Sequence, residues 1–368
     1  MRRDVEQLVH LLSVHCRNFR CLSEVSFEPA RRLSIIRGAN AQGKTSLLEA
    51  VHFLALTRSH RTTSDAELVR HGEEAFHLNL RAARNDRAVD VAAHFWKGTK
   101  RFRINGVPQT RLSDLLGRVN LVFFSPADIE LVQGGAAVRR RFLDMELSQL
   151  HPPYLNALQL YRQVLRQRNE LLRAHAPDED LIAVWDVQLV THGQILIETR
   201  QAYIAELSGY AMEAYGRLAG HEQLSLRYEP NVPAAADLEA ILNKVRASDI
   251  RRRSTTRGPH LDDLEIHIGG HPARAFGSQG QQKSAALALK LAELGLVHAR
   301  IREYPVLLLD EVLAELDHTR ARRLFEAIPG EVQCIVTTTE AQSDLRRIGV
   351  DAAEFVMHQG VLTQTGSQ

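Results

Sequence analysis

The stretch that decides the fold is Gly38-Ala39-Asn40-Ala41-Gln42-Gly43-Lys44-Thr45, which fits the pattern G-x-x-x-x-G-K-[ST] at every fixed position. An apolar run precedes it at residues 33–36 and a helical pattern follows, so we expect a loop between a strand and a helix. Its glycines let successive backbone N–H groups face phosphate oxygens, and the helix adds the positive end of its dipole. We therefore expect this loop, together with Ser46, to bind ATP. Lys44 would contact the β- and γ-phosphates, and Thr45 would be a ligand of Mg²⁺.

A second element of the site, which carries two acidic residues, follows far along the chain. Residues 306–309 are apolar at every position, which predicts a buried parallel strand. The strand delivers Asp310 and Glu311 at its carboxyl end, where open α/β sheets bind ligands. We expect Asp310 to complete the Mg²⁺ site and Glu311 to polarise the attacking water, with Glu311 and Lys44 as the catalytic residues.

A serine–glycine segment, Ser278-Gln279-Gly280-Gln281, immediately precedes a helical pattern. A hydroxyl and a glycine at a helix start form an anion-binding cap, although the segment alone also describes an ordinary helix start. The order along the chain is more informative. A phosphate loop, a helical segment, this cap, an acidic strand and then Asp317 in the D-loop follow one another as in ABC ATPases. In that class the cap of one subunit meets the γ-phosphate held by the other.

The remaining patterns predict the architecture. Residues 76–111 alternate apolar and polar with turn signals at Gly98 and Asn105-Gly106, which indicates antiparallel hairpins. Residues 136–218 carry long helical patterns, enough for at least three helices, but no heptad pattern that persists into a long coiled coil. The predicted fold is an α/β, ABC-type ATPase head with a P-loop mixed sheet and antiparallel β hairpins. Residues 1–127 and 225–368 would form the head, and residues 128–224 an inserted helical lobe.

Taken together, these stretches resemble the RecF family of bacterial recombinational-repair ATPases, which is related to the heads of SMC proteins. The resemblance covers residues 12–339, with residues 1–11 as an extension, and rests on these further matches: Asn18-Phe19-Arg20, Leu48-Glu49-Ala50, Ser59-His60-Arg61, Arg139-Arg140-Arg141-Phe142-Leu143-Asp144, Gly258-Pro259-His260, Glu315-Leu316-Asp317 and Thr337-Thr338-Thr339. Leu261, Lys283-Ser284 and Glu311 depart from the usual family residues, and Thr338 stands where transporter ATPases carry a switch histidine.

The resemblance implies a DNA-binding ATPase whose ATP-dependent homodimer clamps double-stranded DNA near single-strand gaps and helps to load recombinase. It also implies RecR and RecO as partners, and a place near the adenosine for Arg17 and Asn18. Gln133 is a candidate for the water-positioning loop. For Asp262 and Asp263 the sequence suggests no role.

Charge and composition limit the other functions. The net charge is only +2, so DNA binding needs a local basic surface. Residues 139–168 contain six arginines and two acids, and we select Arg139, Arg140, Arg141 and Arg166 as DNA contacts, with a solvated helix face as the equal alternative.

The alternative functions are a transporter ATPase subunit, a structural SMC protein and a small-molecule P-loop kinase. The hairpin-rich residues 76–111 and the missing switch histidine argue against the first, and the absence of coiled-coil repeats argues against the second. A kinase leaves Ser278–Gln282 unexplained. Three cysteines and the lack of a long apolar run favour a cytoplasmic protein that is not embedded in a membrane.

Overall fold

The computed structural model describes residues 7–84, 87–220, 222–339 and 352–365. The chain divides into two compact units, residues 1–128 with 290–368, and residues 129–289. The return to the head therefore falls at residue 290, within α8 (Gln279–Ile301), rather than at residue 225. The reason is that β9 (Leu224–Glu229) pairs with β10 (Asp263–Ile268) and packs on α5 (Glu179–Ala219), all within the second unit.

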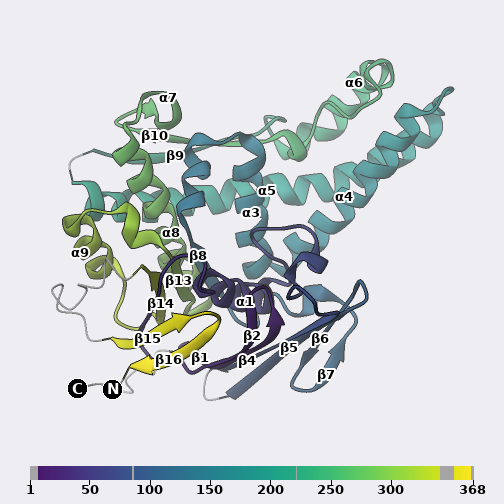
Figure 1. Ribbon diagram of the computed structural model, residues 1–368. Helices are drawn as coiled ribbons and strands as arrows, with labels where there is room; N and C mark the ends of the chain where they lie inside the picture. The colour runs from purple at the N-terminus through teal and green to yellow at the C-terminus, as the bar shows by residue number, and fades with distance from the viewer. Residues whose placement is uncertain (1–6, 85–86, 221, 340–351, 366–368) are drawn as a thin grey trace, which may run out of the picture. The chain divides into compact units, whose positions relative to one another are not determined.

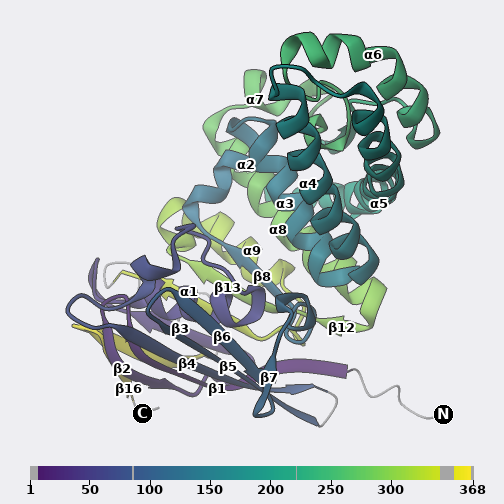
Figure 2. The ribbon, with the colours of Figure 1, turned by 90° about the vertical axis from the view of Figure 1, so that its right-hand side faces the viewer.

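The first unit contains a sheet with strand order β12-β1-β4-β5-β6-β7, and β2 also pairs with β1. It is antiparallel except for β12, which pairs with β1 in parallel, and is called the antiparallel sheet below. Its strands alternate buried and exposed residues, because one face packs on α1 and the other meets solvent. Figure 2 shows β1, β4, β5 and β6 side by side. The strands are β1 (Gln7–Phe19), β2 (Leu22–Phe27), β4 (Ala75–Arg84), β5 (Arg87–Trp96), β6 (Thr99–Ile104), β7 (Val107–Gln109) and β12 (Glu303–Tyr304).

Strand β1 begins earlier than the sequence suggests. Residues 7–11, expected to belong to an extension, are part of β1, and Val9 and Leu11 lie in the core. Their apolar side chains are buried because β1 pairs with β4 over this stretch.

The second sheet of this unit has the order β16-β15-β3-β14-β13-β8 and is parallel except for its last hairpin. The expected strand at residues 306–309 is present as β13 and is buried at every position. The strands are β3 (Leu33–Arg37), β8 (Leu121–Phe124), β13 (Val306–Asp310), β14 (Cys334–Thr338), β15 (Ala353–His358) and β16 (Val361–Thr365).

Helices complete the first unit. The almost wholly buried α1 follows β3 and packs against strands of both sheets. The helices are α1 (Lys44–Leu56), α9 (His318–Ala327), the last part of α8, and the 3-10 helices η1 (Asp65–Leu68), η2 (Leu112–Asp114), η3 (Pro126–Ile129) and η6 (Val312–Glu315).

The second unit is mainly helical, and its longest helices α4 and α5 pack side by side (Figure 1). A three-stranded sheet, β11-β10-β9, packs on α5. Besides α5 and α8, the elements are α2 (Glu130–Gln133), α3 (Ala136–Leu150), α4 (Pro152–Arg173), α6 (Leu238–Arg252), α7 (Ala273–Phe276), β11 (His271–Pro272), η4 (Ala235–Asp237) and η5 (Pro259–Leu261). In the described parts of the chain, no helix has the length and apolarity to cross a membrane.

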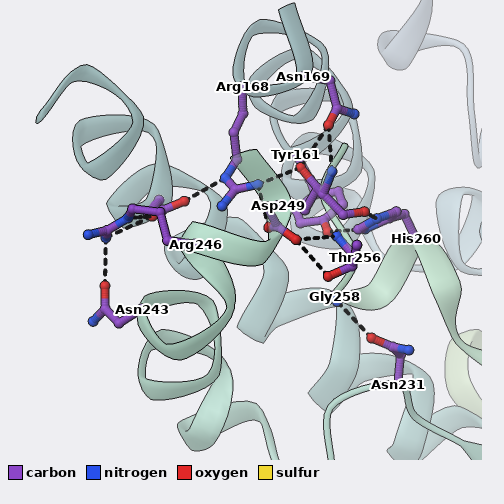
Figure 3. Close-up of polar contacts among 12 residues, drawn as sticks. Tyr161, Arg168, Asn169, Asn231, Asn243, Arg246, Asp249, Thr256, Gly258 and His260 are labelled. Carbon is purple, nitrogen blue, oxygen red and sulfur yellow. Dashed lines mark hydrogen bonds and ion pairs between the residues drawn. The ribbon is translucent and has the colours of Figure 1, made fainter. Parts of the chain in front are cut away.

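A buried ionic network holds the helices of this unit together (Figure 3). The Arg168 guanidinium of α4 pairs with Asp186 of α5 at 2.6 Å and with Asp249 of α6 at 2.8 Å. Asp249 also accepts hydrogen bonds from Thr256, which begins the loop to Gly258-Pro259-His260. Because all three charges are buried, each depends on the others for its solvation.

Candidate active site

The phosphate loop lies between β3 and α1, as expected from the sequence. Gly43 is the N-cap residue of α1 and adopts a left-handed conformation with φ 111°. Because glycine has no side chain with which to cap the helix, the N–H groups of its first turn remain available to an anion.

Two glycines of the loop are required by close contacts. A Cβ at Gly38 (φ 157°) would lie 2.3 Å from the Met357 carbonyl oxygen, and one at Gly43 would lie 2.7 Å from the Leu22 side chain. Neither position accepts a larger residue without displacing its neighbour. The fixed glycines of the motif therefore fit this chain's packing as well as its predicted ligand.

Lys44 is folded back over the loop. Its ammonium donates to the carbonyl oxygens of Gly38 at 2.6 Å and Ala39 at 2.9 Å, and it pairs with Glu311 Oε1 at 2.8 Å. Only 3% of the lysine is exposed. The structure thus brings together the lysine and the glutamate that the sequence assigns to catalysis, although they are far apart along the chain.

The two expected magnesium ligands are also adjacent. The Thr45 hydroxyl donates to Asp310 Oδ1 at 3.0 Å, and the Thr337 hydroxyl donates to the same oxygen at 2.7 Å. Burial raises the pKa of Asp310, and the two hydroxyl donors oppose that shift. A carboxylate and a hydroxyl are the hard oxygen ligands that Mg²⁺ prefers, with phosphate oxygens and waters to complete its octahedron. The donor set therefore fits the ion.

Thr337 has a role that the sequence did not indicate. Its hydroxyl accepts a hydrogen bond from the Glu311 backbone N–H at 3.0 Å while it donates to Asp310. One side chain from β14 thereby orients both acids at the end of β13. Thr338, at the position of the transporter switch histidine, is buried.

The loop opens into a cleft of about 800 Å³. Loop residues line one part of it, and three arginines, Arg20, Arg61 and Arg70, line another. Arg17 and Asn18, which the resemblance places near the adenosine, do not line the cleft. Arg17 instead stands on the outer face of the antiparallel sheet, in register with Glu24 and His77, because its direction alternates with that of the buried Cys16.

An ionic cluster fixes two arginines of the cleft, Arg20 and Arg61. Glu49, fully buried on α1, accepts two hydrogen bonds from Arg20, at 2.9 and 2.7 Å, and one from Ser59 at 2.5 Å, and it pairs with Arg61 at 3.4 Å. Burial alone would raise the pKa of Glu49, but these donors lower it. The motifs around Glu49 and Ser59 carried the resemblance, yet only the structure shows that they orient cleft residues.

The hairpin β15–β16 supports the phosphate loop from a segment that sequence analysis did not connect with the site. At its turn, Gln359 N–H donates to the Gln42 side-chain oxygen at 2.6 Å, and Gly360 N–H donates to the Gln42 carbonyl at 3.0 Å. No motif marks this turn, so the sequence offered no signal for it.

The serine–glycine segment lies in the second unit, at the start of α8. Ser278 and Gln281 form a capping box, in which Ser278 N–H donates to Gln281 Oε1 at 2.7 Å and Gln281 N–H donates to Ser278 Oγ at 3.3 Å. Gln279 and Gly280 form the first turn between them. Ser278 is exposed. Within one chain the segment is therefore a helix cap that faces solvent.

Two further candidates also cap or brace helices. Asp317 is the N-cap of α9 and accepts from the Arg320 N–H at 2.8 Å. The Gln133 amide donates to Gln282 Oε1 at 2.7 Å within the second unit. Nothing in these contacts assigns Gln133 to water positioning.

The arginines selected as DNA contacts separate into two groups. Arg139 is buried and forms two hydrogen bonds, at 2.7 and 2.8 Å, with the Asp263 carboxylate, so the prediction that it contacts DNA is wrong. Its charge is already neutralised inside the fold. Arg140 is half-buried and donates to the Asp262 carbonyl at 2.6 Å. Arg141 and Arg166 are exposed.

The same contacts give Asp262 and Asp263 a structural role. Asp262 is fully buried, pairs with the equally buried Arg200 at 2.9 Å and accepts from the Tyr228 hydroxyl. Asp263 is the partner of Arg139. These two acids therefore tie α3 and α5 to the start of β10.

Comparison with known proteins places these features in one family. A family model described as "RecF/RecN/SMC N terminal domain" matches residues 10–348. The "DNA replication and repair protein RecF" of Lactobacillus delbrueckii subsp. bulgaricus is 39% identical over 361 residues, which cover 94% of this chain and 95% of that protein. The protein of the same name from Lactobacillus acidophilus is 41% identical over 350 residues, covering 91% and 92%.

Solved structures of RecF and of an Smc head domain have a similar fold. The "recombination mediator protein RecF-ATP in RecFOR pathway" superposes with a TM-score of 0.91 at 30% identity and covers 100% of both chains. An Smc head domain from Pyrococcus furiosus superposes with a TM-score of 0.58 at 17% identity, over 97% of this chain and 96% of that one, which shows the fold alone. The predicted α/β ABC-type head without a long coiled coil is confirmed.

Proposed function

Because the chain belongs to the RecF/RecN/SMC N-terminal domain family, we propose that it is a Mg²⁺-dependent ATPase of DNA replication and recombinational repair. One observation carries the proposal. Lys44, Thr45, Asp310 and Glu311, which sequence analysis assigned to phosphate, metal and water, meet at one cleft on the phosphate loop.

Each of these residues has a separate task. The first-turn N–H groups of α1 and the Lys44 ammonium bind the phosphate chain of ATP. Thr45 and Asp310 would hold Mg²⁺, which would supply positive charge against the phosphate chain of ATP. Glu311 accepts a proton from the attacking water. Glu311 pairs with Lys44, so the phosphate chain of ATP competes with this carboxylate for the lysine.

We place Ser278 in a second subunit's site. Its hydroxyl and the start of α8 face solvent, so both are free to meet an anion held by another chain. A two-fold axis would place the Ser278 of each subunit over the phosphate loop of the other, with Asp317 beside the shared interface. The γ-phosphate is then part of the interface, and ATP drives dimerisation because it binds only the dimer in this way.

The ligand of the dimer is double-stranded DNA near single-strand gaps, where the protein helps to load recombinase and hydrolysis releases it. RecR and RecO are the proposed partners, because the structural neighbour described above belongs to a RecFOR pathway. In the second unit Arg141, Arg166 and the half-buried Arg140 remain as candidates for phosphate contacts.

A mixing experiment tests the composite site. Lys44→Met removes the phosphate counter-charge and Ser278→Arg blocks the cap, so each variant alone should be inactive. A mixed dimer contains one intact site, formed by the Lys44 of one subunit and the Ser278 of the other. Partial recovery of ATP hydrolysis on mixing supports the arrangement.

The control is Ser278→Thr, which keeps the hydroxyl that caps α8. It should retain activity and form dimers with ATP but not with ADP, as measured by sedimentation. If Ser278→Arg hydrolyses ATP and dimerises like the natural chain, the serine is only a helix cap and the composite site is wrong.

A further inference from the structure

The outer face of the antiparallel sheet carries a row of basic side chains. In the strand register, Arg17 of β1 lies opposite His77 of β4, His77 lies opposite His94 of β5, and His94 lies opposite Arg101 of β6. Directly paired residues point to the same face of a sheet. Figure 2 shows these four strands as neighbours, so the row crosses the sheet with an arginine at each end.

Two more arginines lie on this face. Arg103 follows Arg101 by two residues, and Arg81 follows His77 by four, so both point outward with the row. All four arginines are exposed. Within residues 7–84, 87–220, 222–339 and 352–365, none of the four forms a side-chain hydrogen bond or an ion pair. Their charges are therefore available to a ligand.

The acids on the same face neutralise only part of this charge. Asp90 lies opposite Arg81 and is held by the Asn79 amide at 3.0 Å, and Glu24 lies opposite Arg17 and contacts His15 at 3.3 Å. Four arginines against two acids leave the face positive.

The two central histidines of the row, His77 and His94, lie within this positive potential. Their Nδ1 atoms lie 3.1 Å apart and their ring centroids 4.2 Å apart. Partial burial and the positive charge of the neighbouring His94, Arg17 and His15 lower the pKa of His77. A bound anion would oppose that repulsion and favour the protonated form of His77. A bound cation is disfavoured, and the described residues hold no group of three or more metal-ligand side chains.

We propose that this face binds the sugar–phosphate backbone of duplex DNA, as a surface of the ATPase unit separate from the arginines of the second unit. The row spans three strand intervals, about 14 Å at the usual spacing of about 4.8 Å. That span is close to the roughly 12 Å width of the DNA major groove, so Arg17 and Arg101 match phosphates on its two sides. The inference rests on the proposed function in taking DNA as the ligand.

The test uses the full chain and a labelled duplex, with the salt dependence of binding measured by fluorescence anisotropy without nucleotide. Arg101→Thr with Arg103→Thr removes two charges from β6 and keeps residues that favour strands. The salt slope should fall by up to about 1.8, since each lost phosphate contact contributes about 0.9. The matched control, Arg320→Gln with Arg322→Gln, removes two charges from α9 of the same unit and should leave the slope unchanged.

A second readout separates this face from other basic surfaces. Binding by the natural chain should strengthen as the pH falls below about 6.5, because His77, whose pKa is lowered from that of a free histidine, gains its proton there. His77→Asn should lose that pH dependence and keep its affinity at the higher pH. Thermal unfolding of each variant verifies that it is folded.

The proposal is overturned if the Arg101/Arg103 variant keeps the natural salt slope, or loses no more than the α9 control. It is also overturned if the substitutions at Arg101 and Arg103 weaken the binding of poly-glutamate but not the binding of DNA. That result would show that the face binds an acidic protein. If the natural chain fails to hydrolyse ATP or to dimerise with ATP, the proposed function is contradicted. The DNA binding measured without nucleotide would not be affected by that outcome.

Discussion

The pairing of Lys44 with Glu311 predicts that a catalytic variant binds nucleotide more tightly than the natural chain. The two side chains meet at 2.8 Å, with the lysine 3% and the glutamate 23% exposed. ATP must take the lysine away from this carboxylate. Glu311→Gln removes the competing charge and leaves a neutral hydrogen bond in its place.

The magnitude follows from the two kinds of hydrogen bond. A bond to a charged group contributes about 1.5–3 kcal/mol and a neutral one about 1, so the contact between Lys44 and residue 311 weakens by about 1 kcal/mol in the variant. ATP should therefore bind about fivefold more tightly, because about 1.4 kcal/mol corresponds to tenfold. The gain should be larger for ATP than for ADP, since the natural carboxylate also repels the γ-phosphate. Turnover should fall by about 10²-fold or more with the loss of the base.

The assay is equilibrium binding of a slowly hydrolysed ATP analogue and of ADP, followed by single-turnover hydrolysis. Glu315→Gln is the matched control, because it removes the same charge one turn further along and should leave the affinity of both nucleotides unaltered. Weaker binding by Glu311→Gln, or an equal shift in both variants, would refute the competition between carboxylate and phosphate.

Four other outcomes are expected. Arg168→Met should destabilise the chain by about 3–5 kcal/mol in urea unfolding, because it leaves the buried carboxylate of Asp249 unpaired; a smaller loss than that of an exposed ion pair would contradict the network. Burial lowers the pKa of His60 to about 4, so the folded chain prefers the neutral ring. The free energy of unfolding should therefore be highest above about pH 6.5 and should fall by up to about 3 kcal/mol as the pH falls toward 4. His60→Phe should reduce that acid sensitivity, and an unchanged pH profile of unfolding would assign it to other groups. Gln42→Ala should raise the KM for ATP a few-fold and leave kcat unaltered, whereas equal effects on both would show that the hairpin contact serves catalysis itself. Arg141→Ala with Arg166→Ala should flatten the salt slope of DNA binding by up to about 1.8 without a change in stability. Arg139→Ala should instead lower the stability of the chain. The reverse pattern would restore Arg139 as a DNA contact.

The parts of the site that could be predicted are those whose chemistry restricts the residue type locally. The phosphate loop needs glycines, a lysine and a hydroxyl at fixed spacing, so Gly38 to Thr45 identifies it without any tertiary information. Asp310 and Glu311 were found because a short all-apolar run indicates a buried parallel strand, and the two acids stand at its end.

The predictions that failed have one cause in common. The contact that decides each of them is with a residue distant in the sequence. Arg139 has the same local pattern as an exposed arginine, and only its contact with Asp263, 124 residues away, shows that it is buried. Strand β9 would have the same alternation in either unit, so its sequence gives no boundary between them. The alternation in β1 did contain the signal that Arg17 points away from the cleft, but the expected adenosine contact rested on resemblance.

The order of strands around the phosphate loop has a consequence for the nascent chain. Strand β3 is translated early, but both of its neighbours, β14 and β15, are made some three hundred residues later. During most of synthesis the loop therefore has neither the flanking strands nor the Gln359–Gly360 turn that holds Gln42. A ribosome-bound or prematurely terminated chain carries the complete phosphate-binding motif without the support that shapes it. The phosphate loop therefore gains this support only after the last strands of the described chain, β14 to β16, have been made.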